Sequence, residues 1–122
     1  MKTFISLCVL ALILSMNANA AEKLEHVVSF KFKPSASPED IKKVEEAFRA
    51  LKSKIPEIVT FEWGTNVSKE NKDKGFTHCF ILSFKNEKDR DSYIHHPEHQ
   101  AFGKIAGPTL ADVFVIDFLA KD

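Results

Sequence analysis

Three of the five histidines of this chain lie in the short stretch HHPEH at residues 95–99, and Tyr93 precedes it by two positions. A neutral imidazole can accept a proton, and a phenol can donate a hydrogen bond to an oxygen. Together these groups can remove a proton from a substrate and stabilise the negative charge that develops. The sequence therefore predicts His99 as a general base and Tyr93 as a hydrogen-bond donor.

Pro97 determines how this stretch folds. Proline favours the first turn of a helix and keeps the preceding residue out of helical geometry, so one short helix is expected to end here and another to begin. His99 then lies in the first turn of the second helix, where the helix dipole disfavours an imidazolium and keeps the ring neutral. Tyr93 and His96 are three residues apart, which brings the phenol to the same junction.

The other two histidines, His26 and His78, fall in alternating segments that are predicted to be strands. Each is in phase with phenylalanines, so both imidazoles are expected on the sheet face beneath the helices. Two interpretations stay open: a core imidazole satisfied by a hydrogen bond, or an imidazole that binds a ligand. For the second interpretation, the expected ligand-binding residues are His26, His78, His96, Phe30, Phe80 and Phe48.

Metal binding is an alternative use of the histidines, with His96 and His99 on one helix and a third ligand from a strand. The pattern for it is weak because helical zinc pairs usually lie four residues apart and Pro97 interrupts the register. Motifs for a nucleophilic serine or cysteine and for a phosphate-binding glycine loop are missing from the sequence. We therefore expect neither a metal nor a cofactor.

The elements that must position these residues can be read from periodicity. Strands are predicted at residues 24–32, 58–63, 76–84 and 113–119, with a turn at 64–66. A helix capped by Ser37 is predicted at 38–55, and the two short helical pieces lie at 87–96 and 97–106. The order β-α-β-β-α-β predicts an α+β, ferredoxin-like fold, in which an antiparallel four-stranded sheet carries its helices on one face.

The other face of such a sheet would be left bare. Its expected members form an apolar patch that is too large to leave in water on a domain of this size. The final strand has little polar alternation, which suggests that both of its faces are covered, and Cys79 is expected to be a small buried side chain. We therefore expect a homodimer that packs sheet against sheet into a dimeric α+β barrel. The expected patch comprises Val27, Cys79, Ile81, Phe114, Ile116 and Phe118.

Length, charge and the N-terminal segment limit the class of protein. The chain has 122 residues, with 17 basic and 17 acidic side chains, so it lacks the basic field needed for binding nucleic acid. Residues 1–20 resemble a signal peptide, with Lys2, an apolar run that includes Cys8, and small residues before position 21. We expect cleavage after Ala20, an exported single domain at 21–122, and no membrane attachment after cleavage.

Two motifs give the chain a family resemblance: GFTH at residues 75–78 and YIHHPEH at residues 93–99. Together with HVVSFKF at 26–32, they resemble the stress-responsive dimeric α/β-barrel (Dabb) family over nearly the whole of 21–122. The resemblance implies a dimeric ferredoxin-like barrel. It also implies that Tyr93 and His99 match the catalytic pair of a cofactor-free plant polyketide cyclase, and that His26 and His78 match imidazoles of its pocket.

The sequence also departs from that cyclase. The first helix offers Val44, Glu45 and Arg49 where the cyclase has aromatic and aliphatic residues facing an alkyl tail, so a different substrate is expected. The leading hypothesis is an exported homodimer that binds a small apolar or aromatic molecule with a polar head, with cyclase- or lyase-like chemistry open. The alternative is a non-catalytic, stress-linked binding or structural protein.

Overall fold

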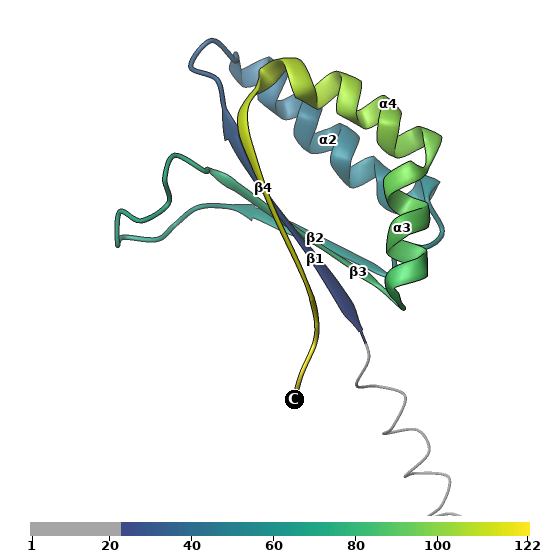
Figure 1. Cartoon of the computed structure of the whole chain (residues 1–122). Coiled ribbons are helices and arrows are strands. Elements are labelled where there is room, and N and C mark those ends of the chain that lie inside the picture. Colours follow the sequence, from purple (N-terminus) through teal and green to yellow (C-terminus); the bar gives the residue numbers. More distant parts are fainter. Residues whose placement is uncertain (1–22) are drawn as a thin grey trace, which may run out of the picture.

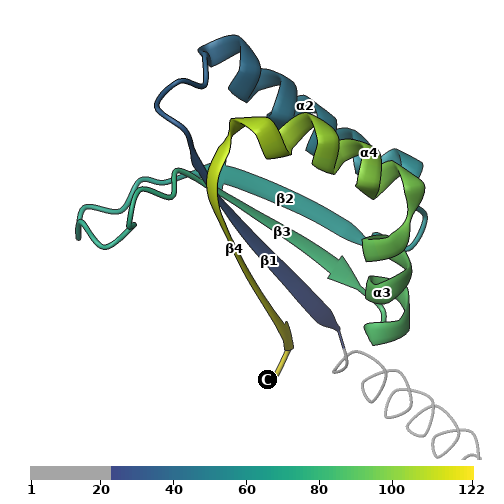
Figure 2. The same cartoon turned by 45° about the horizontal axis from the view of Figure 1, so that its top comes forward.

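The computed structural model describes residues 23–122, so the predicted signal peptide at 1–20 lies outside the described residues. The strands pair in the antiparallel order β2-β3-β1-β4, and all helices lie on one side of the sheet (Figures 1 and 2). This confirms the predicted ferredoxin-like α+β fold. The elements are β1 (Leu24–Phe32), α2 (Pro38–Lys54), β2 (Thr60–Thr65), β3 (His78–Phe84), α3 (Glu87–His95), α4 (Pro97–Ala106), the 3-10 turn η1 (Gly107–Thr109) and β4 (Leu110–Leu119).

The first helix, α2, begins as the sequence predicts. The Ser37 hydroxyl accepts a hydrogen bond from the Asp40 N–H at 3.1 Å, and the Asp40 carboxylate accepts one from the Ser37 N–H at 3.3 Å. This reciprocal cap satisfies two backbone donors that the helix itself leaves free. Val44, Phe48 and Leu51 then recur on one face and are buried against the sheet.

Aromatic side chains dominate the core between the sheet and the helices. The ring centroid of Phe48 lies 4.4 Å from that of Phe80 and 4.5 Å from that of Phe102. Offset and tilted pairs at such distances stabilise a core beyond the burial of their area. Because the rings come from α2, β3 and α4, they fix both main helices against the sheet.

The second strand differs from its prediction. Ile58 is fully buried but precedes β2, which starts at Thr60 and continues to Thr65. Gly64 and Thr65, expected in a turn, instead pair with β3 residues Cys79 and His78. The β2–β3 ladder extends past Gly64 because β3 offers hydrogen-bond partners up to that point. This pairing outweighs the turn preference of the local sequence.

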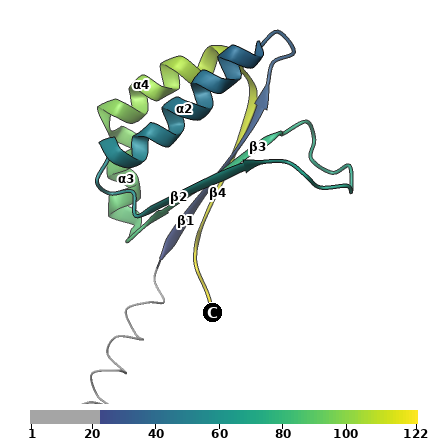
Figure 3. The same ribbon diagram turned by 180° about the vertical axis from the view of Figure 1, so that it is seen from behind.

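Two other strand boundaries also shift. β3 begins at His78 rather than at residue 76, because the β2–β3 loop protrudes beyond the sheet up to that point (Figures 1–3). β4 begins at Leu110 rather than at residue 113, because Leu110 pairs with Phe32 at the end of β1. Within residues 23–122, no helix combines the length and hydropathy needed to cross a bilayer.

Within residues 23–122, no helix or loop covers the face of the sheet opposite the helices, which is called the bare face below (Figure 3). Cys79 lies on this face and is exposed, so the expectation of a buried thiol is wrong for one chain by itself. Phe114 and Ile116 on β4 are 53% and 50% exposed. The expectation that both faces of the last strand are covered is therefore not met by the residues that the structure describes.

Candidate functional site

A pocket of about 420 Å³ lies between the strands β1 and β4 and the helices α3 and α4. Three side chains with titratable groups line it, His26, Tyr93 and His99, and the other lining side chains are apolar. A mostly apolar cavity with a few convergent polar groups is the usual form of a small-molecule site. A more open hollow of about 500 Å³ lies on the bare face of the sheet, where no comparable group of imidazoles converges.

The break between α3 and α4 brings two of these groups together. His96 has extended geometry with ψ 137°, as expected before a proline, and Pro97 occupies the first turn of α4. Tyr93 therefore lies at the end of one helix and His99 at the start of the next. Their ring centroids are 4.5 Å apart, so the two rings are in contact, and both residues line the pocket.

The environment of His99 favours the neutral ring. Burial lowers the pKa of His99, and the nearby His26 lowers it further, while the hydrogen bond to the Ile94 carbonyl acts in the opposite direction. The helix N-terminus was expected to keep this ring neutral, whereas burial is the main cause of its lowered pKa. Nδ1–H donates to the Ile94 carbonyl at 2.9 Å, which leaves Nε2 as the nitrogen that can accept a proton.

Tyr93 is fully buried. Burial raises the pKa of its phenol above the ordinary value, and the Asp117 carboxylate raises it further, so the hydroxyl keeps its proton. Among the described residues, no group lies within hydrogen-bond reach of this hydroxyl. An unpaired buried donor costs stability, and the residue that carries this one lines the pocket.

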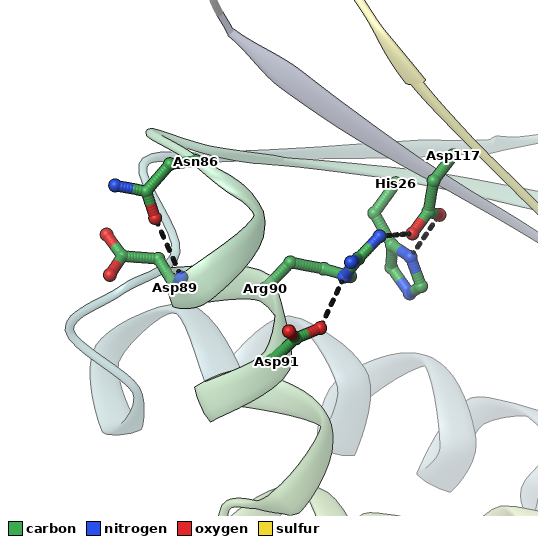
Figure 4. Close-up of polar contacts among 6 residues, drawn as sticks. All are labelled: His26, Asn86, Asp89, Arg90, Asp91 and Asp117. Carbon is green, nitrogen blue, oxygen red and sulfur yellow. Dashed lines mark hydrogen bonds and ion pairs between the residues drawn. The ribbon is translucent and has the colours of Figure 1, made fainter.

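The third polar residue, His26, belongs to a chain of ion pairs (Figure 4). Its Nδ1–H donates to Asp117 Oδ1 at 2.6 Å, and Arg90 Nη1 donates to Asp117 Oδ2 at 2.8 Å. His26 and Asp117 are directly opposite each other in the β1–β4 ladder. The carboxylate thereby fixes the tautomer of His26 and leaves Nε2 unprotonated in the neutral ring.

Sequence reasoning missed Asp117 and Arg90. One signal was present: Asp117 is the only charged residue in the segment 113–119, and strand alternation places it on the same face as Val113 and Val115, both of which line the pocket. A single carboxylate on the covered side of an apolar strand requires a partner. Nothing in the linear sequence indicated that the partners would be His26 and Arg90.

His78 does not line the pocket, so the expectation that it lies beside Tyr93 and His99 is wrong. It lies beneath the helices, as strand alternation predicted, but it pairs with Phe30, whereas His26 pairs with Leu82. Four residues along a strand separate the two imidazoles by about 13 Å. His78 Nε2–H donates to Glu45 at 2.7 Å, and Nδ1 accepts from the Thr77 hydroxyl at 2.8 Å.

Two further candidates have other structural roles. His96 Nδ1 accepts a hydrogen bond from the Glu98 N–H at 3.1 Å, so this side chain caps α4. Phe80 is fully buried between Phe48 and Trp63 and does not line the pocket. The predicted residues that do line it are Phe30 and Phe48 together with His26, Tyr93 and His99.

Over residues 23–122, His, Cys, Asp and Glu side chains do not form a group of three or more that could hold a metal ion. The helical pair His96 and His99 that the metal alternative requires is divided between a cap and the pocket. The polar groups of the pocket are thus the His99 imidazole, whose Nε2 can accept a proton, the His26 imidazole and the Tyr93 phenol, a set that suits proton transfer next to an oxygen.

Fold and pocket together define an α+β ferredoxin-like protein with a buried His/Tyr site. The family model described as Stress responsive A/B Barrel Domain matches residues 24–120, and the chain belongs to this family. The stress-response A/B barrel domain-containing protein HS1 of Arabidopsis thaliana is 36% identical over 95 residues, which cover 78% of this chain and 87% of that protein. Olivetolic acid cyclase of Cannabis sativa is 25% identical over 98 residues, with 80% and 97% covered.

Solved structures agree with the fold. A hydroxynitrile lyase from Passiflora edulis superposes with a TM-score of 0.79 at 23% identity, covering 84% of this chain and 96% of the lyase. A dimeric protein of unknown function with a ferredoxin-like fold from Bacteroides fragilis superposes with a TM-score of 0.65 at 29% identity, covering 80% and 95%. The likeness to the lyase concerns the fold alone. The Bacteroides fragilis protein is described as dimeric.

Proposed function

We propose that this chain is an exported homodimer whose pocket binds a small apolar or aromatic molecule with a polar head, and that His99 and Tyr93 perform acid–base chemistry on it. The observation that carries the proposal is the buried Tyr93 hydroxyl, which has no partner among the described residues and belongs to a residue that lines the pocket. A ligand oxygen would complete its hydrogen bonding, while the apolar wall would hold the rest of the molecule.

The chemistry that fits these groups is removal of a proton from a carbon next to a carbonyl. His99 Nε2 would take the proton, and the electron pair would move to the carbonyl oxygen, where the Tyr93 hydroxyl donates a hydrogen bond. Both catalytic groups in this step are side chains of the protein. The similarity to olivetolic acid cyclase supports a cyclase- or lyase-like reaction. Because the first helix of this chain differs from that of the cyclase, a different substrate is favoured.

Export and dimer formation rest on separate support. The pattern of residues 1–20 favours a cleaved signal peptide, and N-terminal sequencing of the protein from a secreting host should begin at Ala21. The bare apolar sheet face and the dimeric Bacteroides fragilis relative favour a homodimer through that face. Sedimentation that gives the mass of one subunit at micromolar concentration would contradict it.

Acetophenone and ethylbenzene provide a direct test of the pocket, because they have similar shapes and only acetophenone carries a carbonyl. We expect the protein to bind acetophenone more tightly, and we expect Tyr93→Phe to abolish that preference. In D2O, the protein should also accelerate exchange of the methyl protons of acetophenone. Replacing His99 by Gln should slow this exchange by about 100-fold or more.

Each outcome of this test decides between the candidates. Preferential binding without catalysed exchange would favour the non-catalytic, stress-linked binding protein. Equal affinity of wild type and His99→Ala for acetophenone would overturn the assignment of the site. His95→Gln is the matched control, because His95 is exposed on α3 and is not among the pocket residues.

A further inference from the structure

The pocket extends along α4 and β1, and it therefore has two ends. Its lining residues on α4 begin at His99 and continue to Ala106, and Gly107 follows in η1. Those on β1 run from His26 to Phe30. Eight helical residues span about 12 Å, and four strand residues span about 13 Å. Because α4 runs from α3 to the start of β4 (Figure 2), one end of the pocket lies at α3 and the other lies where α4 leads into β4.

The polar side chains of the lining gather at the α3 end. Tyr93 belongs to α3, and its ring centroid lies 5.6 Å from that of His26 and 4.5 Å from that of His99. Among the described residues, the lining toward the β4 end consists of apolar side chains and glycines. These residues are Phe30, Phe102, Gly103, Ala106, Leu110 and Val113. The pocket is thus polar at one end and apolar along the rest of its length.

The two ends also differ in their exposure to solvent. At the α3 end, Tyr93 is fully buried and His26 is 6% exposed. Toward the β4 end, Gly103 and Gly107 are exposed, and Val113 is 45% exposed. Apolar surface beside a cavity is stabilised when an apolar molecule removes it from water. The arrangement therefore favours a ligand whose polar head is enclosed at α3 and whose apolar tail lies between α4 and β4.

Gly103 lies one helical turn beyond His99, on the same face of α4. A Cβ atom built at Gly103 would have no heavy atom within 4 Å, and its φ is not positive. Glycine also destabilises the interior of a helix relative to alanine, so neither packing within residues 23–122 nor backbone conformation explains it. Because Gly103 lines the pocket, a side chain there would occupy part of the cavity.

The second glycine of the lining has a backbone reason of its own. Gly107 precedes Pro108 and has helical geometry, with φ −47° and ψ −50°. A residue with a Cβ atom is disfavoured in this conformation before a proline. The argument about the ligand therefore depends on Gly103, which has no such reason.

The chemistry of the α3 end favours a neutral head. No lysine or arginine of residues 23–122 lines the pocket, so a carboxylate there would lose its hydration without gaining a cation. Burial lowers the pKa of His99, which keeps this ring from supplying the positive charge. A carbonyl group needs only a hydrogen-bond donor, and Tyr93 keeps its proton because burial raises the pKa of its phenol.

We infer that the substrate class of this pocket is a neutral carbonyl compound with an elongated apolar tail. The carbonyl lies among His26, Tyr93 and His99, and the tail runs along α4 past Gly103 toward β4. Gly103 is then the residue that sets how long a tail the pocket accepts. This inference rests on the proposed function and names the substrate class of the same site.

Methyl propyl ketone and methyl heptyl ketone test the tail, because they share one head and differ by four methylene groups. Each added methylene should be buried on about half of its surface, so isothermal titration calorimetry should show methyl heptyl ketone binding about tenfold or more tightly. Octanoate, which has a similar length and a charged head, should bind at least about tenfold more weakly than methyl heptyl ketone above pH 7.5. Equal or tighter binding of octanoate would overturn the neutral head.

Gly103→Val tests the path of the tail. Valine is no worse than glycine inside a helix, so the fold should persist, while the side chain should reduce the ratio of the two ketone affinities to about twofold. Lys104→Val is the matched control, because Lys104 is the exposed neighbour on α4 and does not line the pocket. Phe114→Ala on the bare face controls for adsorption of the tail there. Both controls should keep the wild-type ratio.

The outcomes separate this inference from the proposed function. Equal affinity of wild type for the two ketones, or a wild-type ratio in Gly103→Val, would overturn the inference and leave the acetophenone result standing. A ratio reduced in Phe114→Ala would also overturn it, because the tail would then lie on the bare face. A protein that binds neither the ketones nor acetophenone would overturn the proposed function as well.

A second measurement needs no variant. The chain has 4 glycines, so protein made with 15N-labelled glycine gives a spectrum with few amide signals. Methyl heptyl ketone should shift the signals of Gly103 and Gly107, and methyl propyl ketone should shift that of Gly107 less. Gly64, which borders the hollow on the bare face, should not shift. A shift of Gly64 in place of Gly103, or no shift of Gly103 at saturation, would overturn the inference.

Discussion

Asp117 lies directly opposite His26 in the β1–β4 ladder, and its carboxylate accepts the Nδ1–H of that histidine at 2.6 Å while Arg90 holds its other oxygen. A single cross-strand pair therefore links α3, β1 and β4 at the wall of the pocket. Since the carboxylate accepts from Nδ1, it sets which nitrogen of His26 can face a ligand.

Replacing Asp117 by Asn should disturb this tautomer. An amide can donate as well as accept, so we expect the imidazole nitrogens of His26 to shift in 15N NMR spectra, and catalysed exchange of acetophenone protons to fall about tenfold or more. Asp91→Asn is the control: Asp91 also binds Arg90, at 3.0 Å, but it is mostly exposed and does not contact His26. Equal effects of the two substitutions would show that the tautomer of His26 is unimportant.

Tyr93→Phe should make the protein more stable and less able to bind carbonyl compounds. The hydroxyl is buried and has no hydrogen-bond partner in residues 23–122, so its removal should raise the free energy of unfolding by about 1 kcal/mol or more. Urea unfolding without ligand measures this change. A loss of stability would mean that the hydroxyl is satisfied in the free protein, which would weaken its assignment as the donor to a ligand.

The lowered pKa of His99 predicts the direction of a pH effect. The unfolded chain, in which this histidine has a pKa of about 6.5, binds more protons than the folded chain as pH falls through and below that value. The free energy of unfolding should therefore fall with pH in this window. His99→Gln should show a smaller loss than wild type between pH 7.5 and 5.5 in urea unfolding, whereas the exposed His95→Gln should behave as wild type.

The pair formed by His78 and Glu45 should support the fold rather than the chemistry. Glu45→Ala removes the acceptor of a histidine that is 7% exposed, so we expect a loss of about 1–3 kcal/mol in the free energy of unfolding. The rate of acetophenone exchange per folded molecule should not change. Glu46→Ala, at the exposed neighbouring position, should affect neither quantity, and slower exchange in Glu45→Ala alone would return His78 to the site.

Much of the fold could be predicted because local signals and tertiary structure agree. Ser37 and Pro38 mark a helix start, and Pro97 marks a helix break, and the structure has both. The boundary of β2 could not be predicted, because pairing with β3 continues through Gly64 despite its turn preference. Strand ends depend on how far the neighbouring strand offers partners, which is long-range information.

The site was predictable only where a local sequence signal agrees with the tertiary structure. Alternation correctly placed His26 and His78 on the covered face, but it carries no information about position along the sheet. The antiparallel register of β1 and β3 separates them, and this register is set by packing, because α2 and β2 lie between the two strands in the sequence. Asp117 was missed because its importance comes from a partner that is 91 residues away in sequence.

The strand β4 serves two sides of the molecule in strict alternation. Val113 and Val115 line the pocket, Asp117 lies on the same face of the strand, and the residues between them point to the bare face. Because side chains on a strand alternate with a period of two, deleting one residue in β4 would exchange these two sets over the rest of the strand. Insertions and deletions should therefore be far less tolerated here than in the protruding β2–β3 loop.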